Sequence, residues 1–268
     1  FCGWGAAGGY VGNLSVGPYA KSIGTENAVW LVVPTLVIAA VIFAWASVDQ
    51  HIEKIEHEQV AFSDGFRRVA KNRVLLGILG LVVLSQFALT LIDFRWKLEL
   101  QDAIQSTAER TDAYGVVYGL ISVMELVLQM AAGPVLKLLG AGGVLLAIPM
   151  LLTVGTAALA SGASVLSGVK VASKGLDYSL FRIAKEILYI PLSYDDKSRG
   201  KPVIDILGYR AAKGAISLLL IIPWLQTPFR IEVLTLGALA LWCAVTFLRR
   251  PQPEKIPNNS KGLEKQAV

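Results

Sequence analysis

Ionisable and polar side chains recur at helical spacing within four apolar stretches of the chain. Residues at positions i, i+4, i+7 and i+11 share one face of a helix. On this spacing the sequence carries four polar stripes: Gln86, Thr90, Asp93 and Lys97; Tyr114, Tyr118, Ser122, Glu125 and Gln129; Lys170, Lys174 and Asp177, with Lys185 close to the same face; and Lys201, Asp205, Tyr209, Lys213 and Ser217. Ionisable groups are costly in hydrocarbon, so we expect the four stripes to face one polar cavity inside a helix bundle.

Cations outnumber acids around this predicted cavity. The candidate ligand-binding cations are Lys170, Lys174, Arg182, Lys185, Arg210 and Lys213. Such a set suits an anionic ligand that bears phosphate or carboxylate. The acids either hold the lysines apart while the site is empty or accept a proton, and the sequence leaves both roles open. Tyr209 can stack on a base, or it can pack at a membrane interface.

Simpler roles compete with ligand binding for several of these side chains. Lys97, Lys201 and Glu186 lie near the ends of predicted spans, where long side chains can reach the interface and contact no ligand. Asp93 can form a structural ion pair with a nearby cation. Glu125 sits in the middle of its span, which favours a functional role.

The elements that carry the stripes are apolar blocks of roughly 20 residues, the length that crosses a bilayer. The chain has 268 residues, of which 54% are hydrophobic and 17% charged, and its mean hydropathy is +0.56. We therefore predict an all-α, polytopic membrane helix bundle. It has about eight spans, at 1–20, 28–47, 74–97, 113–136, 141–161, 163–192, 202–224 and 230–248.

Lys and Arg alternate between richer and poorer loops along these spans. The segment 48–73 and the C-terminal tail are rich in them, so the positive-inside rule places both in the cytoplasm. Six spans after a long cytoplasmic linker are typical of one half of a two-half transporter. We predict four regions: 1–47, the last two helices of an N-terminal half; 48–73, a cytoplasmic linker; 74–249, a six-helix C-terminal half; and 250–268, a cytoplasmic tail.

Other functional classes find little support in the sequence. Cys2 and Cys243 form no disulfide framework or metal motif, and His51 and His57 both fall in the linker, so we expect no enzyme, metal or cofactor site. The net charge of +5 gathers in short loops, so we expect no nucleic-acid partner. The motif GWGAAG lacks the strand that a dinucleotide fingerprint needs. Its small-xxx-small pairs, Gly5/Gly9 and Gly8/Gly12, instead predict close helix packing.

Two motifs carry a resemblance to a known family. The segment DYSLFRIAKEILYIPLSYDDKSRGKPVIDILGYRAAKG resembles the family block YSLFxxxKExxYIPL followed by KxKxxIDxxxxxxGKxxG, and LTLIDFRWKLEL resembles the segment NLVExxWKxxL. Both are signatures of the ATP/ADP translocases, the nucleotide transporters of plastids and bacteria. The blocks cover about 60 residues, and the span pattern from 74 to 249 agrees with them.

The resemblance implies a major-facilitator-like fold of twelve spans in two halves, with this chain as spans five to twelve. It implies nucleotide transport by alternating access, as ATP/ADP exchange or proton-coupled uptake, in a bacterial inner membrane. The implied partners are ATP, ADP or another phosphorylated anion, the lipid bilayer, and N-terminal helices that this chain lacks. The residues that match family motif positions are Asp93, Lys97, Lys185, Glu186, Lys201, Asp205 and Lys213.

The sequence also departs from the family pattern at these positions. Asp93 stands where the family usually has Glu, Ala212 precedes Lys213 in place of Gly, and Arg210 adds a cation. Three hypotheses follow: a nucleotide antiporter; a proton-coupled carrier of another anion, with Asp93 and Glu125 as proton carriers; and a non-transporting membrane anchor or sensor built on the transporter fold.

Overall fold

The computed structural model describes residues 2–47, 62–157 and 163–248. The described elements run in the order α1 (Cys2–Ile23), α2 (Thr25–Ala28), η1 (Val29–Leu31), α3 (Val32–Ser47), α4 (Phe62–Lys71), α5 (Arg73–Ala103), α6 (Thr107–Ala157), α7 (Ala163–Leu176), η2 (Asp177–Phe181), α8 (Arg182–Leu188), α9 (Tyr194–Pro202), η3 (Val203–Gly208), α10 (Tyr209–Leu219), η4 (Pro223–Gln226) and α11 (Pro228–Leu248). All are helical, which confirms the predicted all-α class. The predicted tail, 250–268, and both histidines lie outside the described residues.

Within the described residues, four helical stretches are long and apolar enough to cross a membrane: Thr25–Trp45, Arg73–Ala103, Thr107–Ala157 and Pro228–Leu248. The third contains two predicted spans, because Gly140 interrupts α6 with a positive φ of 67°. Three predicted spans are largely helical but are not among these four stretches: 1–20, 163–192 and 202–224. Glycine and charge lower their hydropathy, and π-helical segments divide the last two. The chain is thus a polytopic α-helical membrane bundle, and the number of eight crossings stays a prediction.

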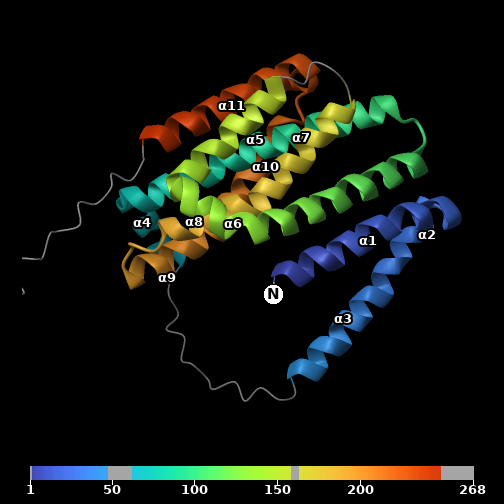
Figure 1. Cartoon of the computed structure of the whole chain (residues 1–268), viewed down its shortest axis with the longest axis horizontal. Helices are drawn as coiled ribbons and strands as arrows, with labels where there is room; N and C mark the ends of the chain where they lie inside the picture. The colour runs from blue at the N-terminus through green and yellow to red at the C-terminus, as the bar shows by residue number, and fades with distance from the viewer. Residues whose placement is uncertain (1, 48–61, 158–162, 249–268) are drawn as a thin grey trace, which may run out of the picture.

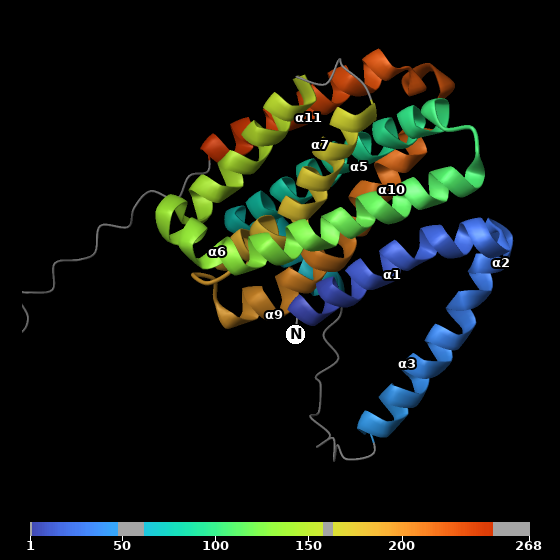
Figure 2. The same cartoon turned by 45° about the vertical axis from the view of Figure 1, so that its right-hand side comes forward.

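Helices α5, α6, α7, α10 and α11 form the bundle (Figure 1). Helix α5 contacts α7, α10 and α11, and α6 contacts α7 and α11. Helix α1 lies along α6, whereas α3 extends away from the bundle in both views (Figure 2). The bundle from α5 to α11 therefore holds all four predicted stripes.

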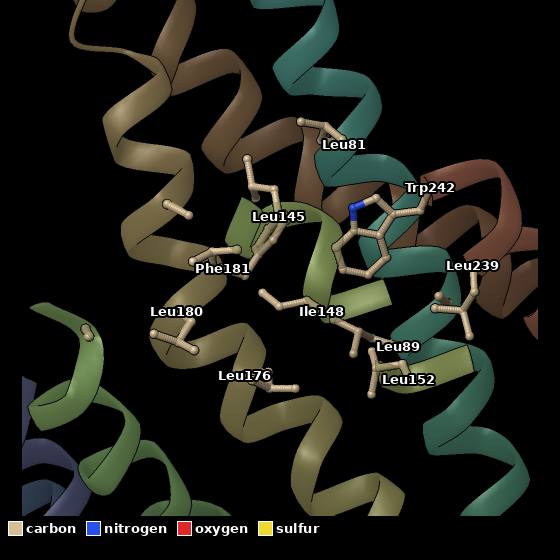
Figure 3. Close-up of a cluster of buried hydrophobic side chains, with 14 residues drawn as sticks. Leu81, Leu89, Leu145, Ile148, Leu152, Leu176, Leu180, Phe181, Leu239 and Trp242 are labelled. Carbon is tan, nitrogen blue, oxygen red and sulfur yellow. The ribbon is translucent and has the colours of Figure 1, made fainter. Parts of the chain in front are cut away.

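The largest core cluster joins α5, α6, α8 and α11 (Figure 3). Phe181 and Trp242 meet edge to face, with ring centroids 5.4 Å apart. Lipid tails are as apolar as these side chains, so such a core stabilises a membrane bundle through van der Waals packing more than through exclusion of water.

Helix α1 packs closely on α6 through one of the predicted glycines, Gly9, and through Gly17, which the prediction did not include. A Cβ on Gly9 would lie 3.1 Å from the Ser122 hydroxyl, and one on Gly17 would overlap Asp112. Gly5, Gly8 and Gly12 have no such neighbour within 4 Å. The prediction from small-xxx-small pairs is therefore wrong for these three, because α6 approaches another face of the helix.

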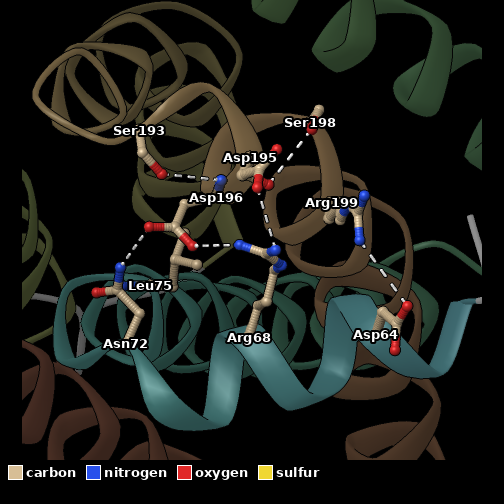
Figure 4. Close-up of polar contacts among 9 residues, drawn as sticks. All are labelled: Asp64, Arg68, Asn72, Leu75, Ser193, Asp195, Asp196, Ser198 and Arg199. Carbon is tan, nitrogen blue, oxygen red and sulfur yellow. Dashed lines mark hydrogen bonds and ion pairs between the residues drawn. The ribbon is translucent and has the colours of Figure 1, made fainter.

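Polar contacts attach α4 to α9 at one end of the bundle (Figure 4). Arg68 pairs with Asp195 at 3.2 Å and with Asp196 at 3.5 Å. The Asn72 side chain accepts a hydrogen bond from the backbone N–H of Val74, which caps α5, and donates another to Asp196 at 3.1 Å. The end of the predicted linker is thus an ordered helix that is fixed to the bundle.

Candidate functional site

The first part of the site is a buried lysine held by a carboxylate on a neighbouring helix. Asp93 on α5 forms an ion pair with Lys170 on α7 and a second with Lys97, at 2.8 Å, one turn along its own helix. The Lys170 side chain is 1% exposed and that of Lys97 is 47% exposed. Asp93 therefore neutralises a cation that has almost no access to solvent, as the structural alternative for this residue predicted.

Aromatic side chains surround the same lysine. The Lys170 ammonium lies 5.3 Å from the ring centroid of Trp96 and 5.4 Å from that of Tyr118. Trp96 donates a hydrogen bond to the Ser167 hydroxyl at 2.9 Å, and Tyr114 meets its ring edge-on. Cation–π contact adds to the ion pair in such an enclosed position. Sequence reasoning missed Trp96 and Ser167, although Trp96 stands next to Lys97 in the shorter family motif.

A buried carboxylate occupies the middle of the site. Asp177, the first residue of η2, is 7% exposed and accepts a long hydrogen bond of 3.5 Å from the Gln86 side chain. The charges of Lys174, Lys213 and Arg182 act on it. Among the described residues no cation approaches the Asp177 carboxylate within the 4.0 Å of an ion pair. Asp177 thus lies within electrostatic reach of cations on α7, α8 and α10 and forms an ion pair with none of them among the described residues.

Tyr178 and Glu125 extend this middle region toward α6. The Tyr178 ring lies 5.5 Å from the Lys174 ammonium and 6.0 Å from the Arg182 guanidinium. Glu125 accepts a hydrogen bond of 2.9 Å from Gln129 in its own helix and lies within electrostatic reach of Arg182. The stripe of α6 therefore faces the stripe of α7 and α8.

A second buried lysine is paired between the sixth and seventh predicted spans. Lys185 on α8, 5% exposed, contacts Asp205 in η3 at 2.6 Å and lies 5.0 Å from the Tyr209 ring centroid. Lys201 pairs with Glu186 at 2.6 Å, and both side chains are partly exposed. The exposure of the second pair fits the interfacial role that was the alternative for Lys201 and Glu186.

Two π-helical segments set the direction of these side chains. η2 and η3 interrupt their helices just before Lys185 and around Asp205. A π-helical turn contains an extra residue, so each side chain beyond it is rotated from the position that a regular helix would give. Regular spacing placed Lys185 close to the Lys170 face. In the structure it points instead to Asp205 and Tyr209.

Two of the predicted stripes meet at a cavity. A cavity of about 480 Å³ lies between α5 and α10, lined by Thr90, Asp93 and Lys97 from one stripe and Ser217 from another. The predicted binding cations do not line it. Lys170, Lys174 and Lys185 are buried, whereas Arg182, Arg210 and Lys213 are exposed. One cavity lined by all four stripes stays a prediction, and in the described part of the chain Arg182, Arg210 and Lys213 lie on an open face.

The described residues offer no group of three or more His, Cys, Asp or Glu side chains that could hold a metal ion. The chemistry that the arrangement does support is anion binding. Lys174 and Arg182 both lie against the Tyr178 ring, Lys213 is within electrostatic reach of the neighbouring Asp177, and none of the three engages an acid in an ion pair among the described residues.

Comparisons with known proteins agree with this chemistry. A family model described as TLC ATP/ADP transporter matches residues 147–247. ADP,ATP carrier protein 5 of Rickettsia conorii is 24% identical over 186 residues, which are 60% of this chain and 37% of the relative. ADP,ATP carrier protein 1 of Chlamydia pneumoniae is 26% identical over 210 residues, 69% of this chain and 39% of the relative.

The chain spans well under half the length of these relatives. No solved structure matches it significantly. The family match covers α7 to α10, the elements that carry the converging cations. Together these matches support the resemblance to the ATP/ADP translocase family that its two sequence motifs predicted.

Proposed function

We propose that this chain is the C-terminal part of a secondary transporter that moves a nucleotide or a related phosphorylated anion by alternating access, with ATP/ADP exchange as its reaction. The family supports nucleotide transport. The proposal also includes a multi-pass position in a bacterial inner membrane, with 48–73 and the tail in the cytoplasm. Transport moves the substrate without breaking a covalent bond, so the chain is not an enzyme in this proposal.

The observation that carries the proposal is the group of cations around Asp177. Lys174 on α7 and Arg182 on α8 lie 5.5 Å and 6.0 Å from the ring centroid of Tyr178, the residue after Asp177, and Lys213 on α10 lies within electrostatic reach of the same carboxylate. Arg and Lys donate strong, charge-assisted hydrogen bonds to phosphate oxygens. Arg182 and Lys213 are exposed, so a phosphate can reach them without opening the helix core.

The paired lysines give the site a second state. Asp93 pairs with Lys170, and Asp205 pairs with Lys185. A bound phosphate competes with these carboxylates for the lysines, and the ion pairs form again when it leaves. A ligand shifts a conformational equilibrium only by its different affinity for the two states. Exchange of ion-pair partners supplies such a difference and links substrate binding to movement of α5, α8 and η3.

Tyr209 and Arg210 complete the proposed site at the start of α10. Tyr209 lies against the paired Lys185 and can stack on the base of a nucleotide. Arg210 is exposed next to it and can contact a phosphate or the sugar. The family motif does not include Arg210, so this cation is where the substrate preference of this chain would differ from that of its relatives.

Asp177 is buried and forms no ion pair with a described residue, which favours a second candidate function, proton-coupled transport of an anion. A buried carboxylate in a membrane span marks a proton pathway when no cation pairs with it. Asp93, one of the predicted proton carriers, is instead committed to two lysines. Proton coupling predicts that an inward pH gradient drives uptake and that Asp177→Asn abolishes this dependence. Uptake that is the same with and without the pH gradient would exclude proton-coupled transport.

Counter-flow separates the two mechanisms and tests the site. Labelled ATP uptake is measured in proteoliposomes that carry the full-length protein and are loaded with ADP, without a pH gradient. We expect uptake that requires internal ADP and falls at least tenfold in Lys213→Gln, whereas Lys137→Gln, an exposed charge loss on α6, keeps it. Equal uptake by Lys213→Gln and Lys137→Gln would contradict the proposed site. Absence of ADP-dependent uptake in folded wild-type protein would contradict the exchange reaction.

A further inference from the structure

A basic pocket lies at the end of the bundle where α4 meets α9, and none of the proposed nucleotide-binding cations lines it. It has a volume of about 840 Å³, and five cationic side chains line it against two acidic ones. The cations are Arg67, Arg68, Lys71, Arg73 and Arg199. Arg68 and Arg199 are engaged with acids on the facing helix, as Figure 4 shows. Arg67 and Lys71 are exposed and form no ion pair with a described residue.

An apolar groove begins where this pocket ends. It has a volume of about 630 Å³ and runs between α5, α8 and the part of α6 beyond Gly140. Val74, Ile78, Leu145 and Ile190 are among its lining residues, and Arg73 lines both the groove and the basic pocket. The pocket and the groove therefore adjoin at Arg73, with cationic side chains on one side and apolar ones on the other.

From this juxtaposition we infer a binding site for one anionic phospholipid, with its phosphate headgroup among the cations of α4 and an acyl chain in the apolar groove. Basic pockets between membrane helices on the cytoplasmic side suit anionic headgroups. The groove belongs to a membrane bundle and opens beside its first long span, so an acyl chain reaches it from the bilayer.

The shape of the site distinguishes a lipid from a soluble phosphate. A free phosphate or the phosphate chain of a nucleotide would use the cations and leave the apolar groove unoccupied. A neutral lipid would use the groove and leave Arg67 and Lys71 without an anion. Only an amphiphile with a negative headgroup matches both parts. The headgroup would also lie across α4 and α9, next to Arg68 and Arg199, and so strengthen the contact between these helices.

The test measures lipid retention by the full-length protein. Native mass spectrometry counts the phosphatidylglycerol and phosphatidylcholine molecules that stay bound after transfer from mixed micelles containing equal amounts of both. We expect one phosphatidylglycerol to be retained in preference to phosphatidylcholine. Each cation near a membrane surface contributes about fivefold in lipid affinity, so Lys71→Gln should lower retention about fivefold, and Arg67→Gln combined with it should lower it further.

Two matched controls separate the two parts of the site. Lys137→Gln removes an exposed charge outside the pocket and should retain phosphatidylglycerol as the wild type does. Ile190→Gln, at a groove residue that is 66% exposed, should lower retention of the lipid, whereas Leu138→Gln, at an exposed residue outside the groove, should not. The five side chains changed in this experiment are all exposed, so the variants leave the bundle core intact: Arg67, Lys71, Lys137, Leu138 and Ile190.

Three results would overturn the inference. The first is equal retention of phosphatidylglycerol and phosphatidylcholine by the wild type. The second is an equal loss in Lys71→Gln and Lys137→Gln, which would indicate general surface charge. The third is displacement of phosphatidylglycerol by pyrophosphate together with no effect of Ile190→Gln, which would assign the pocket to a soluble phosphate.

Discussion

Ion pairs occur in two regions of this molecule and differ in burial. Within the bundle, Lys170 and Lys185 have side chains that are 1% and 5% exposed, and each contacts a carboxylate from another element. At the α4–α9 contact, Arg68 is 33% exposed and its partner Asp195 is 58% exposed. Loss of one partner from a buried pair costs about 3–5 kcal/mol, because a charge is left unpaired. An exposed pair contributes about 0–1 kcal/mol. Ion pairs thus contribute strongly to stability inside the bundle and weakly at the exposed contact.

The comparison also divides the cations of the bundle into two groups. Lys170 and Lys185 are fixed by Asp93 and Asp205, whereas Arg182 and Lys213 are exposed and engage no described acid in an ion pair. Fixed cations stabilise the empty protein, and accessible cations are available to a ligand. Substitutions at the paired side chains should therefore change stability, and substitutions at the accessible cations should change ligand binding.

The largest effect on stability is expected for Asp93→Asn, which leaves Lys170 without a carboxylate inside the bundle. We expect a loss of about 3–5 kcal/mol in the free energy of unfolding, measured in detergent micelles. Asp93→Glu is the matched control and should retain most of the stability, because it keeps the charge. A loss below about 1 kcal/mol in Asp93→Asn would show that solvent reaches Lys170, and the contrast between the two regions would fail.

The pair of Lys185 and Asp205 should show direct coupling. A double-mutant cycle with Lys185→Gln and Asp205→Asn is expected to give a coupling energy of about 1–3 kcal/mol. The same cycle with Lys201→Gln and Glu186→Gln, at a more exposed pair of equal length, should give less than about 1 kcal/mol. Equal coupling energies in the two cycles would mean that burial does not decide the strength of these pairs.

A smaller effect is expected at the aromatic side of Lys170. Trp96→Phe removes the hydrogen bond to Ser167 and should cost about 1–2 kcal/mol, because it also removes some buried ring volume. Ser167→Ala in the Trp96→Phe background should add little, since the hydrogen bond is already lost. Thermal unfolding of the two single variants and the double variant measures this. Additive losses would show that the two side chains act independently.

The smallest effect is expected at the exposed contact. Asp195→Asn should change the free energy of unfolding by less than about 1 kcal/mol, and added salt should reduce even this difference. Unfolding measured at low and high ionic strength checks the prediction. A salt-independent loss of several kcal/mol would show that the α4–α9 contact is as important to stability as the buried pairs.

The sequence predicts the helices of this fold better than the partners of its charges. Apolar blocks located α5, α6 and α11 closely, and helical spacing brought the stripe of α5 to that of α7 through Asp93 and Lys170. Lys185 shows the limit, because the π-helical segment before it rotates it toward Asp205. Trp96 shows another limit, since its role depends on Ser167, 71 residues away. Local spacing contains no information about either contact.

The central claim is that the accessible cations of α8 and α10 bind a nucleotide phosphate, and equilibrium binding of ATP to the full-length protein tests it most directly. Loss of a charge-assisted hydrogen bond should weaken binding about 10- to 100-fold in Lys213→Gln. Lys71→Gln, in the basic pocket at the end of the bundle, should bind ATP as the wild type does. The reverse order, with ATP affinity lost in Lys71→Gln and kept in Lys213→Gln, would contradict the account.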